Sequence, residues 1–148
     1  MKITQLDLVN IINTLNLYGE KKLPQRISYA ITKNIILTKD DYICYEKELR
    51  KIFFRHEDLL QKDEDGNIIC NQNNMPLVKE DVHDNEFNTE IMNLLNLELD
   101  VELYHIPSDA FDYSDDGGKY DALSPNDIIV LQRILCEDEN ETEGQTVE

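Results

Sequence analysis

The chain has 148 residues and a mass of 17.3 kDa, with 31 acidic and 14 basic side chains and a formal net charge of −17. A charge of this sign repels nucleic-acid phosphates and anionic lipid, so it argues against binding either and favours a basic partner. The apolar fraction of 41% without tryptophan is low for a globular protein, so we expect a single elongated domain over residues 1–136 with a thin core.

The charge is unevenly distributed along the chain. Residues 1–62 carry a net charge of +3, residues 63–97 a net charge of −7 and residues 98–148 a net charge of −13. The sequence therefore predicts a mildly basic helical half and a strongly acidic half. Because acidic surfaces also serve solubility alone, the acidic half is either a functional patch or a solubilising surface.

A first helix is predicted from Thr4 to Tyr18. Thr4 suits the N-cap, Asp7 stands at the third helical position, and Gly19 supplies a C-terminal stop. The loop that follows is short, so this helix is expected to fold back on the next one.

A long helix is predicted over residues 23–62. This stretch holds one proline, Pro24 at its start, and no glycine, and its apolar side chains recur every seven residues. A break near Thr38, which can cap a new helix, is the alternative. The first half, Ile27 to Leu37, is apolar on more than one side, which predicts packing against two partners.

The middle of the chain is expected to be a small hairpin or an irregular tip, followed by a helix. Asp65-Gly66 is a tight-turn signal, and residues 68–70 and 75–78 read as two short strands. A third helix is predicted from Glu80 or Asn85 to Leu97. It is short, so it can cover only the distal half of the long helix, running antiparallel to it.

The last third combines a strand, a loop and a helix. Residues 97–104 alternate apolar and acidic side chains, which is the period of a half-buried strand that pairs with the N-terminal residues or with the strand at 68–70. Residues 107–123 are loop-like, and Ser124-Pro125 opens a final helix. The acidic segment 137–148 is predicted to be disordered.

These elements predict a mainly α protein with a small β component (α+β), in which two or three shorter helices and a short hairpin or strand pack on a long central helix. The sequence contains no long apolar run, so we expect neither a signal peptide nor a membrane span. The three cysteines, Cys44, Cys70 and Cys136, lack CxxC spacing and are odd in number, which favours free thiols in a reducing cytoplasm.

Tests for chemistry find no catalytic, cofactor or metal motif. Asp112-x-Ser114-x-Asp116-Gly117 begins like a calcium loop, but Lys119 and Leu123 occupy the eighth and twelfth positions, where an apolar residue and a glutamate belong. His56, His83 and His105 have no partner at zinc spacing, and His56 is expected to be a hydrogen-bonded residue of the helix interface. We therefore predict a protein that is not an enzyme and needs no metal or cofactor.

The most promising interaction surface is acidic and lies in the last third of the chain. Carboxylates spaced along a strand and an ordered loop can imitate a run of phosphates and meet Arg and Lys in charge-assisted pairs, while tyrosines among them can anchor an interface. The predicted partner-binding residues are Glu98, Asp100, Glu102, Asp109, Asp112, Tyr113, Asp115, Asp116, Tyr120 and Asp121. Phe111 and Tyr104 lie among them as further aromatic residues. The alternative contact surface is the long helix, through Tyr42, Tyr45 and Phe54.

Several stretches of this sequence are similar to a known family. They are the N-terminal Met1-Lys2-Ile3 and the segments 21–35, 45–52, 62–67, 86–106 and 123–135. On these stretches, which span most of residues 1–136, the chain resembles a family of small phage and prophage proteins of unknown function from Gram-positive hosts. The family carries no assigned catalytic residues, so none is transferred.

The resemblance implies one of two non-enzymatic roles. The first is an inhibitor of a host anti-phage defence protein, of the anti-CRISPR-like kind, whose acidic surface mimics DNA and occupies a basic nucleic-acid channel in the host cytoplasm. The second is an accessory or assembly protein for the phage tail or virion, which binds a phage structural protein through its long helix. The aspartate-rich loop Asp109–Asp121 and the acidic tail are where this chain departs from the family.

Overall fold

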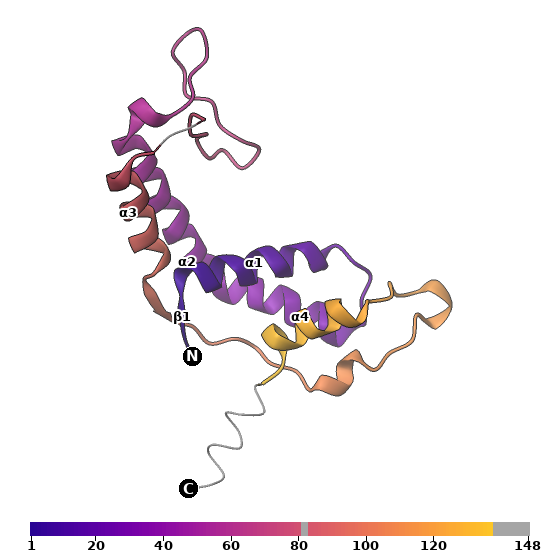
Figure 1. Ribbon diagram of the computed structural model, residues 1–148. Coiled ribbons are helices and arrows are strands. Elements are labelled where there is room, and N and C mark those ends of the chain that lie inside the picture. Colours follow the sequence, from indigo (N-terminus) through magenta and orange to yellow (C-terminus); the bar gives the residue numbers. More distant parts are fainter. Residues whose placement is uncertain (81–82, 138–148) are drawn as a thin grey trace, which may run out of the picture.

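The computed structural model describes residues 1–80 and 83–137. Its elements are the helices α1 (Gln5–Gly19), α2 (Gln25–Arg55), α3 (Asn85–Leu95) and α4 (Pro125–Leu135) and the strands β1 (Lys2–Thr4) and β2 (Glu98–Asp100). The molecule is L-shaped (Figure 1), with a base formed by α1, α4 and the first half of α2, and an arm formed by α3 and the second half of α2. The predicted fold class, mainly helical with a small β component, is confirmed.

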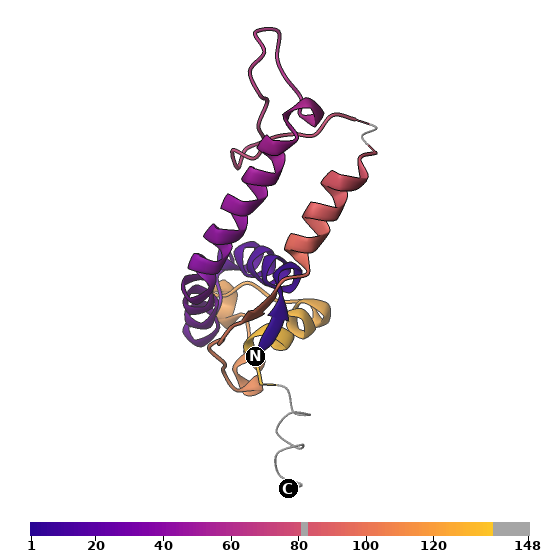
Figure 2. The same cartoon turned by 90° about the vertical axis from the view of Figure 1, so that its left-hand side faces the viewer.

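Helix α2 is continuous, as predicted, but it changes direction near its middle (Figures 1 and 2). The buried Thr38 hydroxyl donates a hydrogen bond of 2.7 Å to the Asn34 carbonyl one turn earlier. A threonine that bonds to the carbonyl four residues before it competes with the helix's own ladder and bends the helix. The residue considered as a break point therefore marks a bend in an unbroken helix.

The predicted C-terminal boundary of the long helix, at residue 62, is wrong. Helix α2 ends at Arg55, and Glu57–Leu59 form a 3₁₀ turn. The chain leaves the helix axis there because Leu60 turns inward and is fully buried in the arm.

Helices α1 and α4 begin where the sequence places their caps. Thr4 and Asp7 form a capping box at the start of α1, and Ser124 and Asp127 form another at the start of α4, with Pro125 in its first turn. Each box satisfies two backbone N–H groups that have no partner within the helix.

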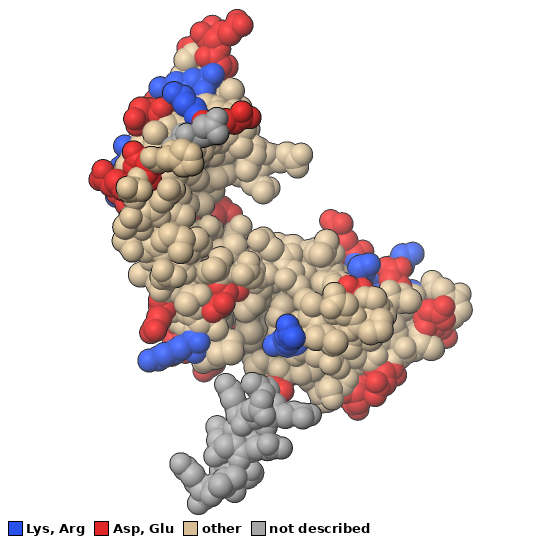
Figure 3. All heavy atoms as spheres, viewed as in Figure 1, with Lys and Arg blue, Asp and Glu red and all other residues tan. Residues whose placement is uncertain are grey.

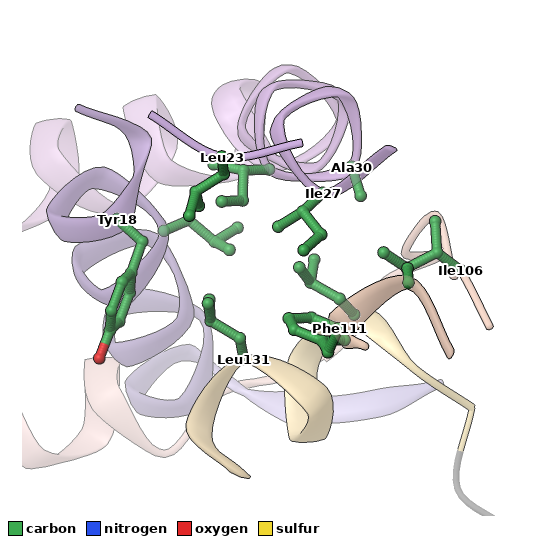
Figure 4. Close-up of a cluster of buried hydrophobic side chains, with 11 residues drawn as sticks. Tyr18, Leu23, Ile27, Ala30, Ile106, Phe111 and Leu131 are labelled. Atoms are coloured by element: carbon green, nitrogen blue, oxygen red, sulfur yellow. The ribbon is translucent and has the colours of Figure 1, made fainter. Parts of the chain in front are cut away.

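The base has its own hydrophobic core (Figure 4), in which side chains of α1 and the first half of α2 meet the segment 106–111 and α4. Leu15, Ile27 and Leu131 are completely buried there. Residues 107–123 were expected to be loop-like, and within this segment Ala110 and Phe111 are buried in the base core. The short 3₁₀ turn Ser108–Phe111 turns the two side chains inward, which local loop signals do not reveal.

The arm has a second, separate core. Helix α3 runs antiparallel to the second half of α2, as predicted, and ends two residues before the expected Leu97. Phe87 of α3 packs on Phe53 of α2, with ring centroids 5.7 Å apart. His56 is hydrogen-bonded at this interface, as expected, with its Nε2 atom 3.1 Å from Glu90.

The elbow between base and arm is closed by the two strands and a third small cluster. Strand β2 pairs antiparallel with β1, with Leu99 opposite Ile3, so pairing with the N-terminal residues is confirmed. Leu8, Ile12 and Val101 are buried between them and α1.

A single buried amide ties α2 to the chain that follows β2. The Asn34 side chain donates to the Tyr104 carbonyl (2.9 Å) and accepts from the Tyr104 N–H (2.6 Å). Asn34 has no exposed surface. It therefore replaces the backbone partner that a neighbouring strand would have supplied to Tyr104.

The tip of the arm is a closed ring, so of the two expected arrangements, a hairpin or an irregular tip, the second is observed. Gln61 N–H donates to Leu77 C=O, Leu77 N–H to Ile69 C=O, and Ile69 N–H to Gln61 C=O, at 2.9, 3.0 and 2.9 Å. Gln61, Ile69 and Leu77 are eight residues apart, and the three segments around them meet at this ring. Each segment therefore pairs with both of the others, through isolated bridges and not through regular strands.

An eight-residue repeat underlies this ring. The Asp63 side chain accepts from the N–H groups of the residues two and four positions later, and the Asn71 side chain does the same. Gly66 and Asn74, eight apart, both have positive φ (83° and 60°). The signal in the sequence is Asp63-x-Asp65-Gly66 followed by Asn71-x-Asn73-Asn74. The turn at Asp65-Gly66 was predicted, but its repetition eight residues later was not.

The ends of α1 and α4 are joined by one short polar contact. The Tyr18 hydroxyl donates to the Asp127 carboxylate at 2.5 Å. This bond, the bonds from Ser124 and the nearby Lys21 charge lower the pKa of Asp127 below its ordinary value. The lowered pKa means that folding favours the ionised carboxylate.

Replacing Tyr18 with phenylalanine should raise the pKa of Asp127 towards its ordinary value near 3.8. The stability that ionised Asp127 contributes is present above that value and is lost as the pH falls through the lower pKa of the folded state. The variant should therefore lose less stability than the native protein on acidification across this window. The measurements are an NMR titration of the Asp127 carboxyl carbon and urea unfolding at several pH values. An Asp127 titration identical in both proteins, or changed equally by Tyr29→Phe, would contradict the assignment.

Candidate acidic interaction surface

The aspartate-rich loop at the far end of the base is tied down at both ends. Arg26 of α2 pairs with Asp109 at 3.3 Å. At the other end Asp121 accepts a hydrogen bond from Lys22 N–H through its carboxylate and donates its own N–H to Lys22 C=O, both at 2.7 Å. Two of the predicted partner-binding carboxylates, Asp109 and Asp121, therefore hold the loop in place.

The two tyrosines of the loop, Tyr113 and Tyr120, pack against the loop itself. The rings of Tyr113 and Tyr120 meet edge to face at 5.9 Å, and the Tyr113 hydroxyl donates to Asp121 C=O at 2.8 Å. Burial, reinforced by the charge of Asp121, raises the pKa of Tyr113. Tyr113 packs against the base core and Tyr120 is half-buried, so both support the loop.

All five aspartates of the loop are exposed, and three of them, Asp112, Asp115 and Asp116, take no part in the contacts to Arg26 and Lys22 that hold it. Within the described residues none of the three forms an ion pair, and Lys119 lies over the Tyr120 ring instead, 5.3 Å from its centroid. The loop can therefore present three negative charges on a fixed backbone.

The predicted acidic strip is not continuous. Glu98, Asp100 and Glu102 are exposed around β2 at the elbow, and Asp100 pairs with the N-terminal amine at 3.2 Å. The loop lies at the opposite end of the base (Figure 1). Figure 3 shows acidic side chains at both places, and the surface between them is mostly uncharged and carries a basic side chain. The structure brings the predicted residues together in two groups, not one.

The alternative surface on the long helix is also divided. The rings of Tyr42 and Tyr45 have centroids 5.9 Å apart, and both side chains are half-buried. Tyr42 packs against the cluster at the elbow, and Tyr45 packs against the core of the arm. Burial is the main cause that raises the pKa of each. Phe54 is exposed. Of the three, only Phe54 offers a ring to a partner without loosening the protein's own core.

A hollow of about 710 Å³ lies beneath β1, between α1, α4 and the chain at 103–105. Its lining is mixed, with apolar residues such as Ile3, Ile11 and Ile134 beside charged residues such as Asp7 and Arg133. None of the predicted partner-binding residues lines it.

Two searches of the described residues, 1–80 and 83–137, gave no candidates. They contain no group of three or more His, Cys, Asp or Glu side chains placed to hold a metal ion. No helix in this part of the chain is both long and apolar enough to cross a membrane. The predicted acidic tail, apart from Glu137, lies outside these residues.

One exposed surface was missed by the sequence analysis. The apolar side chains on two sides of residues 27–37 predict two packing partners, but only one side joins the base core, and on the other side Tyr29 meets the Tyr104 ring at a centroid distance of 5.4 Å. Tyr29, Ile36 and Leu37 on the other side are exposed. The double-sided apolar pattern was the signal for this surface.

Comparison with known proteins gives no further lead. No family model, no curated protein and no solved structure matches the chain.

Proposed function

We propose that this is a non-enzymatic binding protein that engages a basic partner through the exposed carboxylates of the loop 109–121. The observation that carries the proposal is the presentation of Asp112, Asp115 and Asp116 on a loop fixed at both ends by contacts to α2 and to the turn before it. A pre-ordered loop loses little conformational entropy on binding, so more of the electrostatic attraction remains as affinity.

The partner that suits this surface is a nucleic-acid-binding protein of the host, whose phosphate-binding groove is lined with Arg and Lys. The resemblance to small phage and prophage proteins supports an inhibitor of anti-phage defence acting in the host cytoplasm. The described Cys44, Cys70 and Cys136 are free thiols, as proteins of a reducing compartment keep them. Assembly into a phage tail or virion through Tyr42 and Tyr45 is less favoured, because both rings are engaged inside the protein.

Charge reversal of the three exposed aspartates, Asp112→Lys, Asp115→Lys and Asp116→Lys together, should abolish capture of the basic partner. The native protein, immobilised and exposed to lysate of the host, should retain a partner that elutes with salt. With that partner purified, the triple variant should associate at least tenfold more slowly and show a shallower dependence on salt, because charge steering acts mainly on the association rate.

The matched control reverses three exposed carboxylates on the arm, Glu64, Asp65 and Glu86, which changes the net charge by the same amount. This control should bind as the native protein does. Equal loss in both variants would show that total charge, and not the loop, is responsible. Unchanged binding by the loop variant would refute the proposal.

A further inference from the structure

Helix α2 has a face along its whole length that no other helix covers. In Figure 2, α2 forms one side of the molecule, and α1, α3 and α4 all lie on its other side. Tyr29, Ile36 and Ile43 follow each other at intervals of seven residues on this side, and Phe54 continues the row on the arm. Tyr29, at one end of the row, also meets the ring of Tyr104 edge to face, with ring centroids 5.4 Å apart. Their exposed fractions are 53%, 63%, 38% and 52%.

This row has the spacing of a helix-packing seam. Residues seven apart on an α-helix lie nearly above one another, and apolar residues at this interval are what a second helix packs against. From Tyr29 to Ile43 the row covers roughly 21 Å at 1.5 Å per residue. Isolated exposed apolar residues need no explanation, but an ordered row on one helix face indicates an interaction site.

The charges beside the row are mostly basic, in contrast to the rest of the protein. Six basic side chains lie within about 60° of the nearest residue of the row, by the 100° turn per residue of an α-helix: Arg26, Lys33, Lys39, Lys47, Arg50 and Lys51. Two acidic side chains, Asp40 and Glu46, lie in the same sector of α2. Arg26 and Lys51 pair with carboxylates of the protein itself. Lys33, Lys39, Lys47 and Arg50 form no ion pair within the described residues, so they are the charges available to a partner.

We propose that this face of α2 binds an acidic amphipathic helix of another protein. The apolar row would pack against the partner's apolar seam, and the flanking Lys33, Lys47 and Arg50 would meet its acidic flanks. The interaction is independent of the acidic loop, since it uses a different element and the opposite sign of charge.

Charge decides between this occupant and two others. A second copy of the chain in a two-fold arrangement would bring the same basic face against itself, and like charges across an interface are unfavourable. An anionic membrane would attract this face but would repel a protein whose net charge is −17. An acidic helix satisfies both the apolar row and its basic borders.

The probe for the test is a synthetic, fluorescein-labelled peptide of three heptads, with leucine at a and d and glutamate at e and g. The glutamates keep the peptide from pairing with itself, and a second peptide with lysine at e and g is the control. Fluorescence anisotropy with the full-length protein should give a Kd on the order of 10 μM or tighter for the acidic peptide. Binding to the lysine peptide should be at least tenfold weaker.

Two variants locate the site. Ile36→Ser with Ile43→Ser should weaken acidic-peptide binding at least tenfold, and Lys33→Glu with Lys47→Glu should weaken it several-fold and flatten its salt dependence. The matched controls change exposed residues elsewhere, Leu6→Ser with Leu17→Ser on α1 and Lys2→Glu with Lys62→Glu, and should bind as the native protein does. Thermal unfolding within 3 °C of the native value would show that each variant is folded.

Any of four results would overturn the proposal. These are no binding of the acidic peptide below 100 μM, equal binding of the two peptides, native-like binding by the Ile36/Ile43 variant, and equal weakening by the α1 control. Two further experiments test the other occupants. Co-sedimentation with phosphatidylglycerol vesicles that is lost in the Ile36/Ile43 variant, without peptide binding, would assign the face to a membrane. Sedimentation at twice 17.3 kDa, reversed by the same variant, would assign it to a second copy.

Discussion

Replacing Phe87 with alanine should lower the free energy of unfolding by about 3 to 5 kcal/mol, the range for removing a buried phenylalanine from a core. Phe87 is 4% exposed and contacts the rings of Phe53 and His56, at centroid distances of 5.7 and 5.4 Å. The arm core is small and separate from that of the base, so few neighbours can move in to fill the space. The measurement is urea unfolding followed by circular dichroism.

Hydrogen exchange should show where the stability is lost. In the Phe87→Ala variant the amides of α3 and of the second half of α2 should exchange much faster, while those of α1 and α4 change little, because the base core keeps all its contacts. Met92→Ala, on the exposed side of α3, is the control and should cost less than 1 kcal/mol. Uniform acceleration over the whole protein would contradict separate cores.

Replacing Asn34 with alanine should lower the free energy of unfolding by about 2 to 3 kcal/mol. The change removes the two hydrogen bonds to Tyr104 and leaves its N–H and C=O without their partner beside a buried site, which costs more than the mean value of two bonds. Asn34→Asp should lose at least as much, since a carboxylate at this fully buried position is desolvated and places an oxygen against the Tyr104 carbonyl, where the amide had donated. Urea unfolding measures both.

Asn13, exposed on α1, supplies the comparison for Asn34. Asn13→Ala should change the free energy of unfolding by less than 0.5 kcal/mol, as surface substitutions usually do. If Asn34→Ala lowered the free energy of unfolding by no more than Asn13→Ala does, the Asn34 side chain would not stabilise the elbow.

The element boundaries that the sequence predicts correctly are those with local causes. Thr4 with Asp7 and Ser124 with Asp127 form caps through atoms three residues apart, so their sequence contains the whole interaction. The antiparallel placement of α3 followed from length and amphipathic pattern, which also act over short range.

The features that the sequence did not predict depend on contacts between distant residues. The sequence favours a continuous long helix, with a break at Thr38 as the alternative, and it does not predict the bend. The bend lies beside the buried contact between Asn34 and Tyr104, which are 70 residues apart. Phe111 looked like a surface anchor because its loop is polar on both sides. Its burial depends on α4, which arrives later in the chain.

For the candidate site, the sequence predicted which residues are acidic and exposed, but not how they are arranged in space. The exposed aspartates are on the loop where the sequence placed them, but Asp109 and Asp121 are used for internal contacts with Arg26 and Lys22, which lie about 80 to 100 residues earlier. The distance in space between the loop and Glu98 depends on the course that the chain takes between them. The order of charged residues in the sequence does not show that course.

The division of the molecule into separate cores along one bent helix also bears on the order in which it folds. The arm core joins residues that are close in sequence, such as Phe53 and Phe87, whereas the base core joins Leu15 to Leu131. Closing a short loop costs less entropy than closing a long one, and structures rich in local contacts form faster. Folding should therefore begin with the arm as a helical hairpin, and the base should close last, when α4 and the segment 106–111 dock on α1 and α2.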